Sequence, residues 1–312
     1  MALTARRLGK AISENARMRI SSLRAYPVID TWMNPVTRGL ARRFTHQEWL
    51  KSHDEIDFAF RMSDVEIGGH PCVRYETQTL RRNDTIILYL HGGGLVSGSP
   101  RVNASMILPT CQLAGVEAVG VAYTLVPEAR FPAQLDEIEA VYLSLKEQCP
   151  EKSIVLFGDS IGGTLALSSM LRWRDSGIEL PVGAILASPA VDGAGESDTH
   201  ISIGGSDPLF SANSDRNCRR LFNFYAPGCD LTNPLISPIY GNLEGLPPIL
   251  VHAGTREVLL GDAARLTEHA RRAGVDVTLR VYDGMFHLFH MHWELSEAKD
   301  AHADIASFIE TL

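Results

Sequence analysis

The stretch that decides the fold is Ser153-Ile154-Val155-Leu156-Phe157-Gly158-Asp159-Ser160-Ile161-Gly162. It opens with a β-branched, apolar run typical of a buried strand, and small residues and helix formers follow Ser160. Gly158 and Gly162 stand where a Cβ would collide with the crossing backbone. The pattern therefore predicts a tight strand–turn–helix that strains Ser160 and lifts its hydroxyl above the sheet, beside free amides at a helix N-terminus.

Length and composition are those of an ordinary globular chain. The 312 residues carry a formal net charge of −8, and 45% of them are hydrophobic. This acidic balance argues against binding to nucleic acid or to an anionic membrane surface, and no apolar run is long enough to predict a membrane span. The basic N-terminal stretch lacks the apolar core and cleavage site of a secretory signal. Five scattered cysteines favour reduced thiols and a cytoplasmic location.

Short apolar segments alternate with helical patterns from about residue 63 to the end of the chain. Eight such segments predict strands, at residues 64–67, 72–76, 85–90, 117–122, 153–157, 182–187, 248–252 and 275–281. Parallel sheets covered on both faces have continuously apolar strands of this kind. The sequence therefore predicts an α/β fold with a mostly parallel, eight-stranded sheet and helices on both faces.

Two regions fall outside this alternation. Residues 1–60 predict two or three helices, interrupted at Pro27, that would suit a linker, a partner-binding helix or a lid. Residues 61–312 form the predicted α/β domain, and within it about 191–225 is rich in Gly, Ser, Asp and Asn with one helical patch. An insertion of that size after a strand is typical of a lid, so we expect it to complete a cap with residues 1–60.

A serine hydroxyl needs an adjacent base, usually a histidine held in place by a carboxylate. Glu257 is the first carboxylate after the strand at 248–252, and His287 is the first histidine after the last predicted strand. The chain order Ser160, Glu257, His287 puts all three on loops at one edge of the sheet. The sequence therefore predicts a catalytic triad of these residues.

Alternatives remain for the acid and for the histidine. Asp262 and Asp283 also follow the right strands, although a helix N-cap and a turn are ordinary uses of aspartate at such positions. The spacing of His287, His290 and His292 raises the question of a metal site, but it lacks nearby cysteines or a carboxylate pair. We expect no metal, and we expect His290 and His292 to lie partly exposed at the start of the last helix.

Glycines follow the predicted strand at 85–90. The tetrahedral intermediate of acyl transfer carries an oxyanion that needs preorganised donors. We expect an oxyanion hole from the backbone amides of Gly92, Gly93 and Gly94, with the amide of Ile161 directly after the nucleophile.

Several motifs occur together in this chain: 91–94 (HGGG), 123–128 (YTLVPE) with 131–133 (FPA), 158–163 (GDSIGG), 245–248 (GLPP) and 284–287 (GMFH). On these motifs, residues 63 to 312 resemble the hormone-sensitive-lipase-like branch of the α/β-hydrolases, the bacterial family IV esterases. The subgroup that contains acetyl-hydrolases and monoterpene lactone hydrolases is the most similar. The resemblance implies the α/β-hydrolase fold, an oxyanion hole from Gly93, Gly94 and Ile161, and an N-terminal helical cap over the site.

The chain departs from this family pattern at three places. Glu257 stands where most members have Asp, and a longer carboxylate can still reach the imidazole. Ile161 replaces the usual Ala, which keeps the amide but narrows the pocket. Ala122 and Thr124 replace the Asp and Arg of a structural ion pair.

The function predicted from these residues is hydrolysis of short- to medium-chain carboxylic esters or lactones through an acyl-enzyme, with no metal or organic cofactor. Trp32, Met33, Leu209 and Phe210 are the candidate substrate-binding residues of an apolar pocket. A small-molecule receptor on the same fold is the alternative, and the intact triad argues against it. The resemblance also suggests a homodimer through the edge strand near 275–281.

Overall fold

A computed structural model describes residues 6–8, 12–23, 29–79, 81, 84–204, 206–210 and 214–312. Its strands are β1 (Arg6–Leu8), β2 (Phe60–Ile67), β3 (His70–Thr77), β4 (Thr85–Leu90), β5 (Glu117–Val121), β6 (Ser153–Asp159), β7 (Gly183–Ala187), β8 (Ile249–Gly254) and β9 (Val277–Tyr282). They form one sheet in the order β1-β9-β8-β7-β6-β4-β5-β3-β2. All eight predicted strands, β2 to β9, are present.

The sheet is parallel from β1 to β5, and only β3 and β2 run antiparallel to their neighbours. Gly68 and Gly69 connect β2 to β3 with φ of +60° and +77°, the left-handed region that favours glycine. A Cβ on Gly68 would also lie 2.4 Å from the carbonyl oxygen of Ala140. The β2–β3 hairpin is therefore fixed both by backbone conformation and by close packing.

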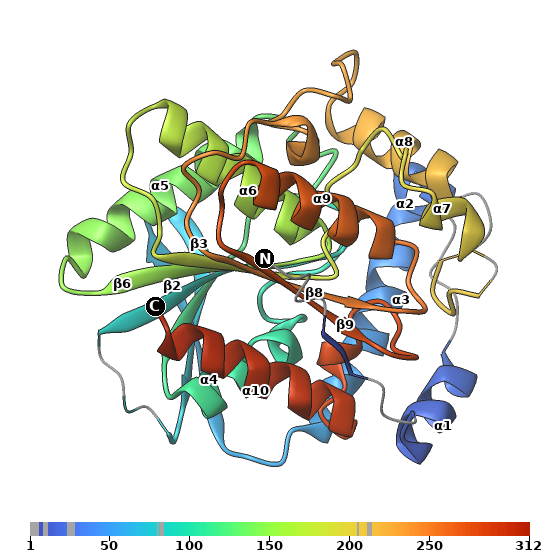
Figure 1. The fold of residues 1–312 in the computed structure, drawn as a ribbon, viewed down its shortest axis with the longest axis horizontal. Helices are drawn as coiled ribbons and strands as arrows, with labels where there is room; N and C mark the ends of the chain where they lie inside the picture. The colour runs from blue at the N-terminus through green and yellow to red at the C-terminus, as the bar shows by residue number, and fades with distance from the viewer. Residues whose placement is uncertain are drawn as a thin grey trace.

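Helices cover both faces of the sheet. The α-helices are α1 (Glu14–Ser22), α2 (Ile29–Met33), α3 (Arg38–Leu50), α4 (Leu108–Ala114), α5 (Ala133–Gln148), α6 (Ile161–Asp175), α7 (Thr199–Ser202), α8 (Ser214–Tyr225), α9 (Leu260–Arg272) and α10 (Ser296–Glu310). Short 3₁₀ helices are η1 (Lys51–Glu55), η2 (Ala104–Met106), η3 (Pro238–Tyr240) and η4 (Phe289–Met291). Figure 1 shows α5, α6 and α9 on one face and α4 and α10 on the other.

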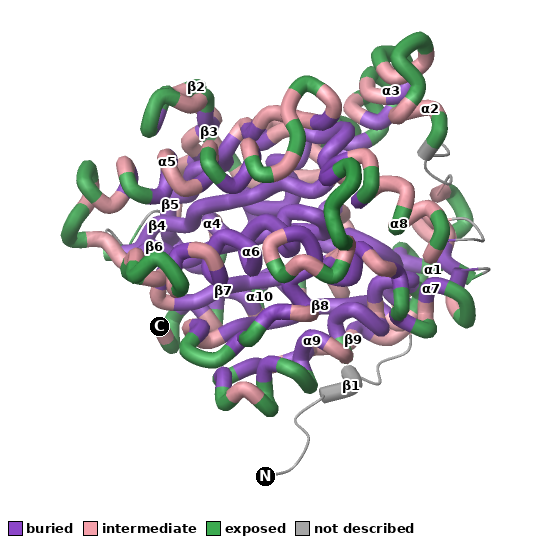
Figure 2. The backbone as a smooth tube through the Cα atoms, turned by 90° about the horizontal axis from the view of Figure 1, so that it is seen from above, coloured by how far each residue is buried: buried purple, intermediate pink, exposed green. Residues whose placement is uncertain are grey.

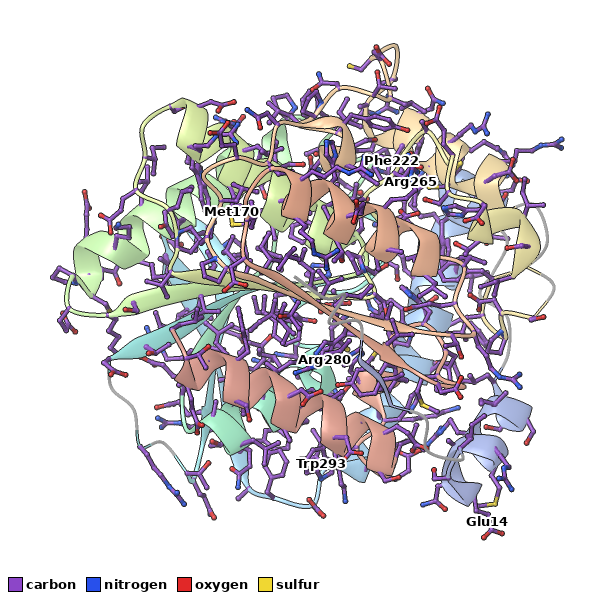
Figure 3. All side chains as sticks on the ribbon, in the orientation of Figure 1. Glu14, Met170, Phe222, Arg265, Arg280 and Trp293 are labelled. Carbon is purple, nitrogen blue, oxygen red and sulfur yellow. The ribbon has the colours of Figure 1, made fainter. Side chains whose placement is uncertain are left out.

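The two faces of the central strand β4 belong to separate apolar cores. Ile86, Leu88 and Leu90 pack with residues of α5, α6 and α9, whereas Ile87 and Tyr89 pack with residues of α4 and α10. Successive side chains of a strand point to opposite faces, so an unbroken apolar run satisfies both layers. In Figure 2 the central strands are buried along their length, and Figure 3 shows Met170 and Trp293 on opposite sides of the sheet.

Helices α2, α3, α7 and α8 gather at one end of the sheet (Figure 1), although they come from distant parts of the sequence. These four helices belong to residues 1–60 and about 191–225, the two segments that the sequence predicts as a cap. The predicted helix interruption at Pro27 lies outside the described residues. Asp30 of α2 forms an ion pair with Arg220 of α8, which joins the two parts. Arg265 of α9, labelled in Figure 3, pairs with Asp192 at the base of the second part.

The sequence predicted only helices in residues 1–60, but the structure also contains strand β1 there. Strand β1 pairs with Arg280–Tyr282 of β9, and a three-residue strand is too short to leave a readable pattern. It covers part of the sheet edge through which the family resemblance suggested a homodimer. Among the described residues, no helix is both long and apolar enough to cross a membrane.

Candidate active site

Ser160 lies at the turn between β6 and α6 with φ of +53° and ψ of −119°. Such a conformation is strained for a residue with a side chain, and it persists only where the surroundings fix it. The Ser160 amide donates to the carbonyl of Ala187 at 2.9 Å. A Cβ on Gly158 would lie 2.3 Å from the carbonyl oxygen of Gly162, and one on Gly162 would lie 2.0 Å from that of Leu90. The two flanking glycines therefore permit the turn, as predicted.

The structure brings Ser160, Glu257 and His287 together. The Nε2 of His287 is 3.1 Å from the Ser160 hydroxyl oxygen, and its Nδ1 is 3.0 Å from Oε2 of Glu257. The other oxygen of Glu257 accepts from the amide of Gly254 at 2.6 Å. All three side chains are buried. A carboxylate on Nδ1 leaves Nε2 free to accept the serine proton, which is the arrangement of a serine nucleophile and its base.

The two alternative acids lie elsewhere. Asp262 is fully buried in the first turn of α9, and its Oδ2 accepts from the amides of Val191 and Asp192. It is not the N-cap that the sequence suggested, because α9 begins two residues earlier, at Leu260. Asp283 accepts from the Thr255 hydroxyl at 3.2 Å, in the turn after β9. Of the three candidate carboxylates, Glu257 is the one that contacts His287.

A further carboxylate, Asp207, organises the loop next to the histidine. It accepts from the amides of Leu209, Phe210 and Val258 at 2.8–3.1 Å. Burial raises its pKa, although these amides and His287 oppose the shift. The sequence analysis did not single it out, because an aspartate in an irregular loop carries no motif.

The glycine loop after β4 borders the serine. Gly93 and Gly94 line the same cavity as Ser160 and Ile161. Their φ values are +116° and +63°, and a Cβ on Gly93 would lie 2.1 Å from the Ser97 carbonyl oxygen. No described residue accepts a hydrogen bond from the amides of Gly93, Gly94 or Ile161. These three amides are therefore available as donors next to the Ser160 hydroxyl.

Gly92 differs from the other two glycines. It does not line the cavity, and its position packs against Asp159, whose Oδ2 would be 2.2 Å from a Cβ there. Asp159 is fully buried and accepts from the Tyr89 hydroxyl at 2.6 Å. Burial raises the pKa of Asp159 to about 6. Gly92 thus makes room for a buried carboxyl group behind the serine, which differs from its predicted place in the oxyanion hole.

Helix α3 holds the glycine loop from outside. Arg42 donates to the carbonyl of Val96 at 2.6 Å and to both carboxylate oxygens of Glu128. Two residues along the loop, the Gly98 amide donates to Nε2 of His46 at 3.0 Å. The loop that carries Gly93 and Gly94 is therefore fixed by two side chains of the N-terminal segment.

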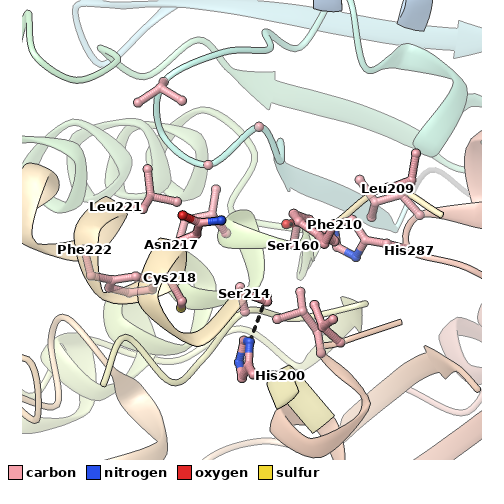
Figure 4. A pocket seen from close by; sticks show the side chains of 18 of the residues that line it. Ser160, His200, Leu209, Phe210, Ser214, Asn217, Cys218, Leu221, Phe222 and His287 are labelled. Atoms are coloured by element: carbon pink, nitrogen blue, oxygen red, sulfur yellow. Dashed lines mark hydrogen bonds between the residues drawn. The ribbon is translucent and has the colours of Figure 1, made fainter. Parts of the chain in front are cut away.

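The cavity in front of Ser160 measures about 130 Å³ (Figure 4). Three of the four predicted substrate-binding residues, Trp32, Leu209 and Phe210, line it. The fourth, Met33, does not, although it lies on the same short helix as Trp32. Residues of the lining that the sequence analysis did not name include Trp49, Val96, His200, Ser214, Asn217, Cys218, Leu221 and Val258. They come from segments that only the tertiary fold brings together.

The three closely spaced histidines face different surroundings. His287 contacts Ser160, whereas the ring of His290 stacks on that of His252 with centroids 5.5 Å apart. His290 is fully buried, so its predicted exposure was wrong: the segment before α10 folds into η4 instead of starting the helix. His292 lies with Glu55 and Glu294 in a group of potential metal ligands, and Arg19 forms ion pairs with both carboxylates.

Comparisons with known proteins agree with this geometry. A family model described as alpha/beta hydrolase fold matches residues 87–291. An acetyl-hydrolase of Streptomyces hygroscopicus is 35% identical over 250 residues, 80% of this chain and 82% of the relative. An esterase of Acinetobacter venetianus is 34% identical over 230 residues, 73% of this chain and 75% of that protein. The crystal structure of an esterase from the bacterial hormone-sensitive lipase family superposes with a TM-score of 0.83 and 29% identity, over 97% of this chain and 99% of the other.

Proposed function

We propose, from the premise that this chain belongs to the hormone-sensitive-lipase family of α/β-hydrolase-fold esterases, that Ser160, His287 and Glu257 hydrolyse carboxylic esters. The chain is a carboxylic ester hydrolase, and the proposal assigns the chemistry to residues. The observation that carries it is the unbroken contact from the Ser160 hydroxyl to His287 and on to Glu257, at 3.1 and 3.0 Å.

The reaction proceeds in two halves. His287 takes the Ser160 proton through Nε2 while the serine oxygen attacks the ester carbonyl, and the resulting oxyanion accepts from the amides of Gly93, Gly94 and Ile161. His287 then donates the proton to the leaving alcohol, which leaves an acyl group on Ser160. In the second half His287 activates water, which releases the acid. Glu257 holds the ring and stabilises the imidazolium in both halves.

The cavity supports a neutral substrate of modest size. Its described lining is largely apolar and contains no Lys, Arg, Asp or Glu. Burying an unpaired charge is costly, so a charged acyl or alcohol group is disfavoured there. Short- to medium-chain esters or lactones fit this lining, and Ile161, which is 1% exposed, restricts the space next to the nucleophile.

We further propose that α2, α3, α7 and α8 act as the cap over this cavity, since α2, α3 and α8 supply Trp32, Trp49 and Leu221 to its lining. A cytoplasmic location is consistent with five unpaired cysteines. A homodimer stays a prediction. Among the described residues, β1 covers Arg280–Tyr282 of that edge and leaves the part of β9 before Arg280 without a neighbouring strand on that side. Sedimentation analysis tests whether a second copy pairs there.

The assignment is tested by replacing the nucleophile. Ser160→Ala should lower the turnover of p-nitrophenyl butyrate by about 10⁶-fold while the far-UV circular dichroism stays unchanged. A fluorophosphonate that labels activated serines should modify the wild type and not this variant. Ser202→Ala, an exposed serine on α7, serves as the matched control and should retain full activity and labelling. Substantial turnover by folded Ser160→Ala would refute the proposal.

A further inference from the structure

A second hydrogen-bonded set of serine, histidine and carboxylate borders the same cavity. The Nδ1 of His200 is 3.1 Å from the Ser214 hydroxyl oxygen, and its Nε2 is 3.3 Å from Oδ1 of Asp262. His200 is 1% exposed, Ser214 6% and Asp262 0%. His200 and Ser214 both line the cavity of Ser160, and Figure 4 shows the bond between them to one side of Ser160 and His287. The proposed ester hydrolysis does not use this set.

The hydrogen bonds that link Ser214, His200 and Asp262 have a defined donor and acceptor at each step. Oδ2 of Asp262 already accepts from two backbone amides, at 3.0 and 3.1 Å, and a carboxylate only accepts. The Nε2 of His200 must therefore carry the proton of the neutral ring, so its Nδ1 is an acceptor. The Ser214 hydroxyl then donates to Nδ1. No other described residue hydrogen-bonds to this hydroxyl, so its oxygen keeps a lone pair for an incoming donor.

Asn217 extends the polar surface by one turn of α8. Residues three apart lie on the same face of a helix, and Asn217 lines the same cavity as Ser214. Its side-chain amide makes no hydrogen bond with a described residue, so both its donors and its acceptor are available. Ser214 and Asn217 together offer what one hydroxyl group requires: an acceptor for its proton and a donor for its oxygen.

The rest of the lining explains why a hydroxyl is the matching group. Most of the neighbouring side chains are apolar, among them Trp32, Leu221, Phe222 and Leu259. A few polar groups in an apolar cavity fix the orientation and identity of a ligand. A charged group would find no counter-charge among the described lining residues, whereas a hydroxyl pairs with neutral partners.

We propose that Ser214 and Asn217, with His200 and Asp262 behind Ser214, form a subsite for a hydroxyl group of the substrate, so that the enzyme prefers hydroxylated esters to their unsubstituted analogues. The proposal rests on Ser160 acting as the nucleophile. The subsite acts through binding, while the acyl transfer takes place at Ser160. A neutral hydrogen bond to a buried group changes the preference between two such esters by about tenfold.

The experiment compares pairs of esters that differ by one hydroxyl. On the acyl side the pairs are p-nitrophenyl butyrate, hexanoate and octanoate against the 3-hydroxybutyrate, 6-hydroxyhexanoate and 8-hydroxyoctanoate esters. On the alcohol side the pair is butyl acetate against 4-hydroxybutyl acetate. The readout is the ratio of kcat/KM for the hydroxylated and unsubstituted members of each pair, measured on the same enzyme sample.

The wild type should prefer the hydroxylated member of at least one pair by about tenfold. Ser214→Ala should bring that ratio close to one, and Ser214→Thr, which keeps the hydroxyl, should retain the preference. Ser202→Ala, the exposed control on α7, should keep the wild-type ratio. If Ser214→Ala does not fold, Asn217→Leu provides the same ratio measurement from a half-buried position and should also reduce it.

Two outcomes would overturn the subsite. The first is a kcat/KM ratio near one for every pair in the wild type. The second is a ratio that Ser214→Ala leaves unchanged, which would mean that the hydrogen bonds of Ser214, His200 and Asp262 only join α7, α8 and α9. Either result leaves the esterase assignment intact. If instead the wild type hydrolyses no ester, or Ser160→Ala hydrolyses both members of a pair, then the proposed function itself fails.

Discussion

Replacing Glu257 with glutamine should slow catalysis by about 10⁴-fold. The Oε2 of Glu257 is 3.0 Å from Nδ1 of His287, and both side chains are almost completely buried. At that distance, with an effective dielectric constant of about 20, Coulomb's law gives about 5.5 kcal/mol between a carboxylate and an imidazolium. His287 is charged only as it takes the serine proton, so the loss falls on the transition state, where about 5.5 kcal/mol corresponds to about 10⁴ in rate.

The assay is the steady-state hydrolysis of p-nitrophenyl butyrate, with active sites counted by a phosphonate titrant. We expect kcat to carry the loss and KM to change by less than about threefold, because substrate binding does not need the imidazolium. Glu257→Asp should lose about 10²-fold, since a side chain one methylene shorter cannot accept from both Gly254 and His287. Asp283→Asn is the matched control and should stay within about threefold of wild type. A loss below tenfold in folded Glu257→Gln would refute the assignment of the acid.

Three further predictions concern other parts of the molecule. Gly93→Ala should abolish most activity and lower the Tm, because its Cβ would meet a carbonyl oxygen at 2.1 Å; Gly69→Ala, also at positive φ but with open space, should lower the Tm without changing kcat. Burial lowers the pKa of His302 to about 4, so between pH 6.5 and 4 the unfolded chain binds a proton at this residue that the folded protein does not. The free energy of unfolding therefore falls as the pH drops from 6.5 toward 4. Urea unfolding of His302→Gln should show a pH slope shallower by about 1 kcal/mol per unit in that window, and an unchanged slope would exclude this histidine. Ile161→Ala should raise the kcat/KM ratio of octanoate to butyrate esters several-fold by enlarging the cavity, and an equal ratio would show that Ile161 does not limit acyl length.

The strands and the three aligned side chains of the site were predictable because their signals are local. A buried strand such as β4 needs an unbroken apolar run, and the sequence shows one at 85–90. Glu257 and His287 follow directly after strands whose carboxyl ends must meet at one edge of the sheet. The tight turn at Ser160 likewise requires small residues two positions before and two after it, and the sequence has Gly158 and Gly162 there.

The remainder depends on contacts between distant segments. Whether Gly92 or Gly93 faces the cavity is decided by the path of the loop around Asp159, which no spacing rule encodes. Asp262 binds the 191–192 backbone instead of capping its own helix, because that loop folds back over α9. His290 is buried by its stacking on His252, a residue 38 positions earlier. Tertiary packing overrides local preference in each of these cases.

The hydrogen bonds of Arg42 and His46 to the glycine loop have a consequence for how substrate specificity can change in this family. Hydrogen bonds of Arg42 and His46 join helix α3 to residues 92–98. A chimera that exchanges α3 alone would therefore lose contacts that hold the glycine loop in place. Helix α8 contributes several residues to the cavity wall and has no hydrogen bond to that loop among the described residues. Recombination between relatives would therefore alter substrate range at less risk to turnover when it exchanges α8 than when it exchanges α3.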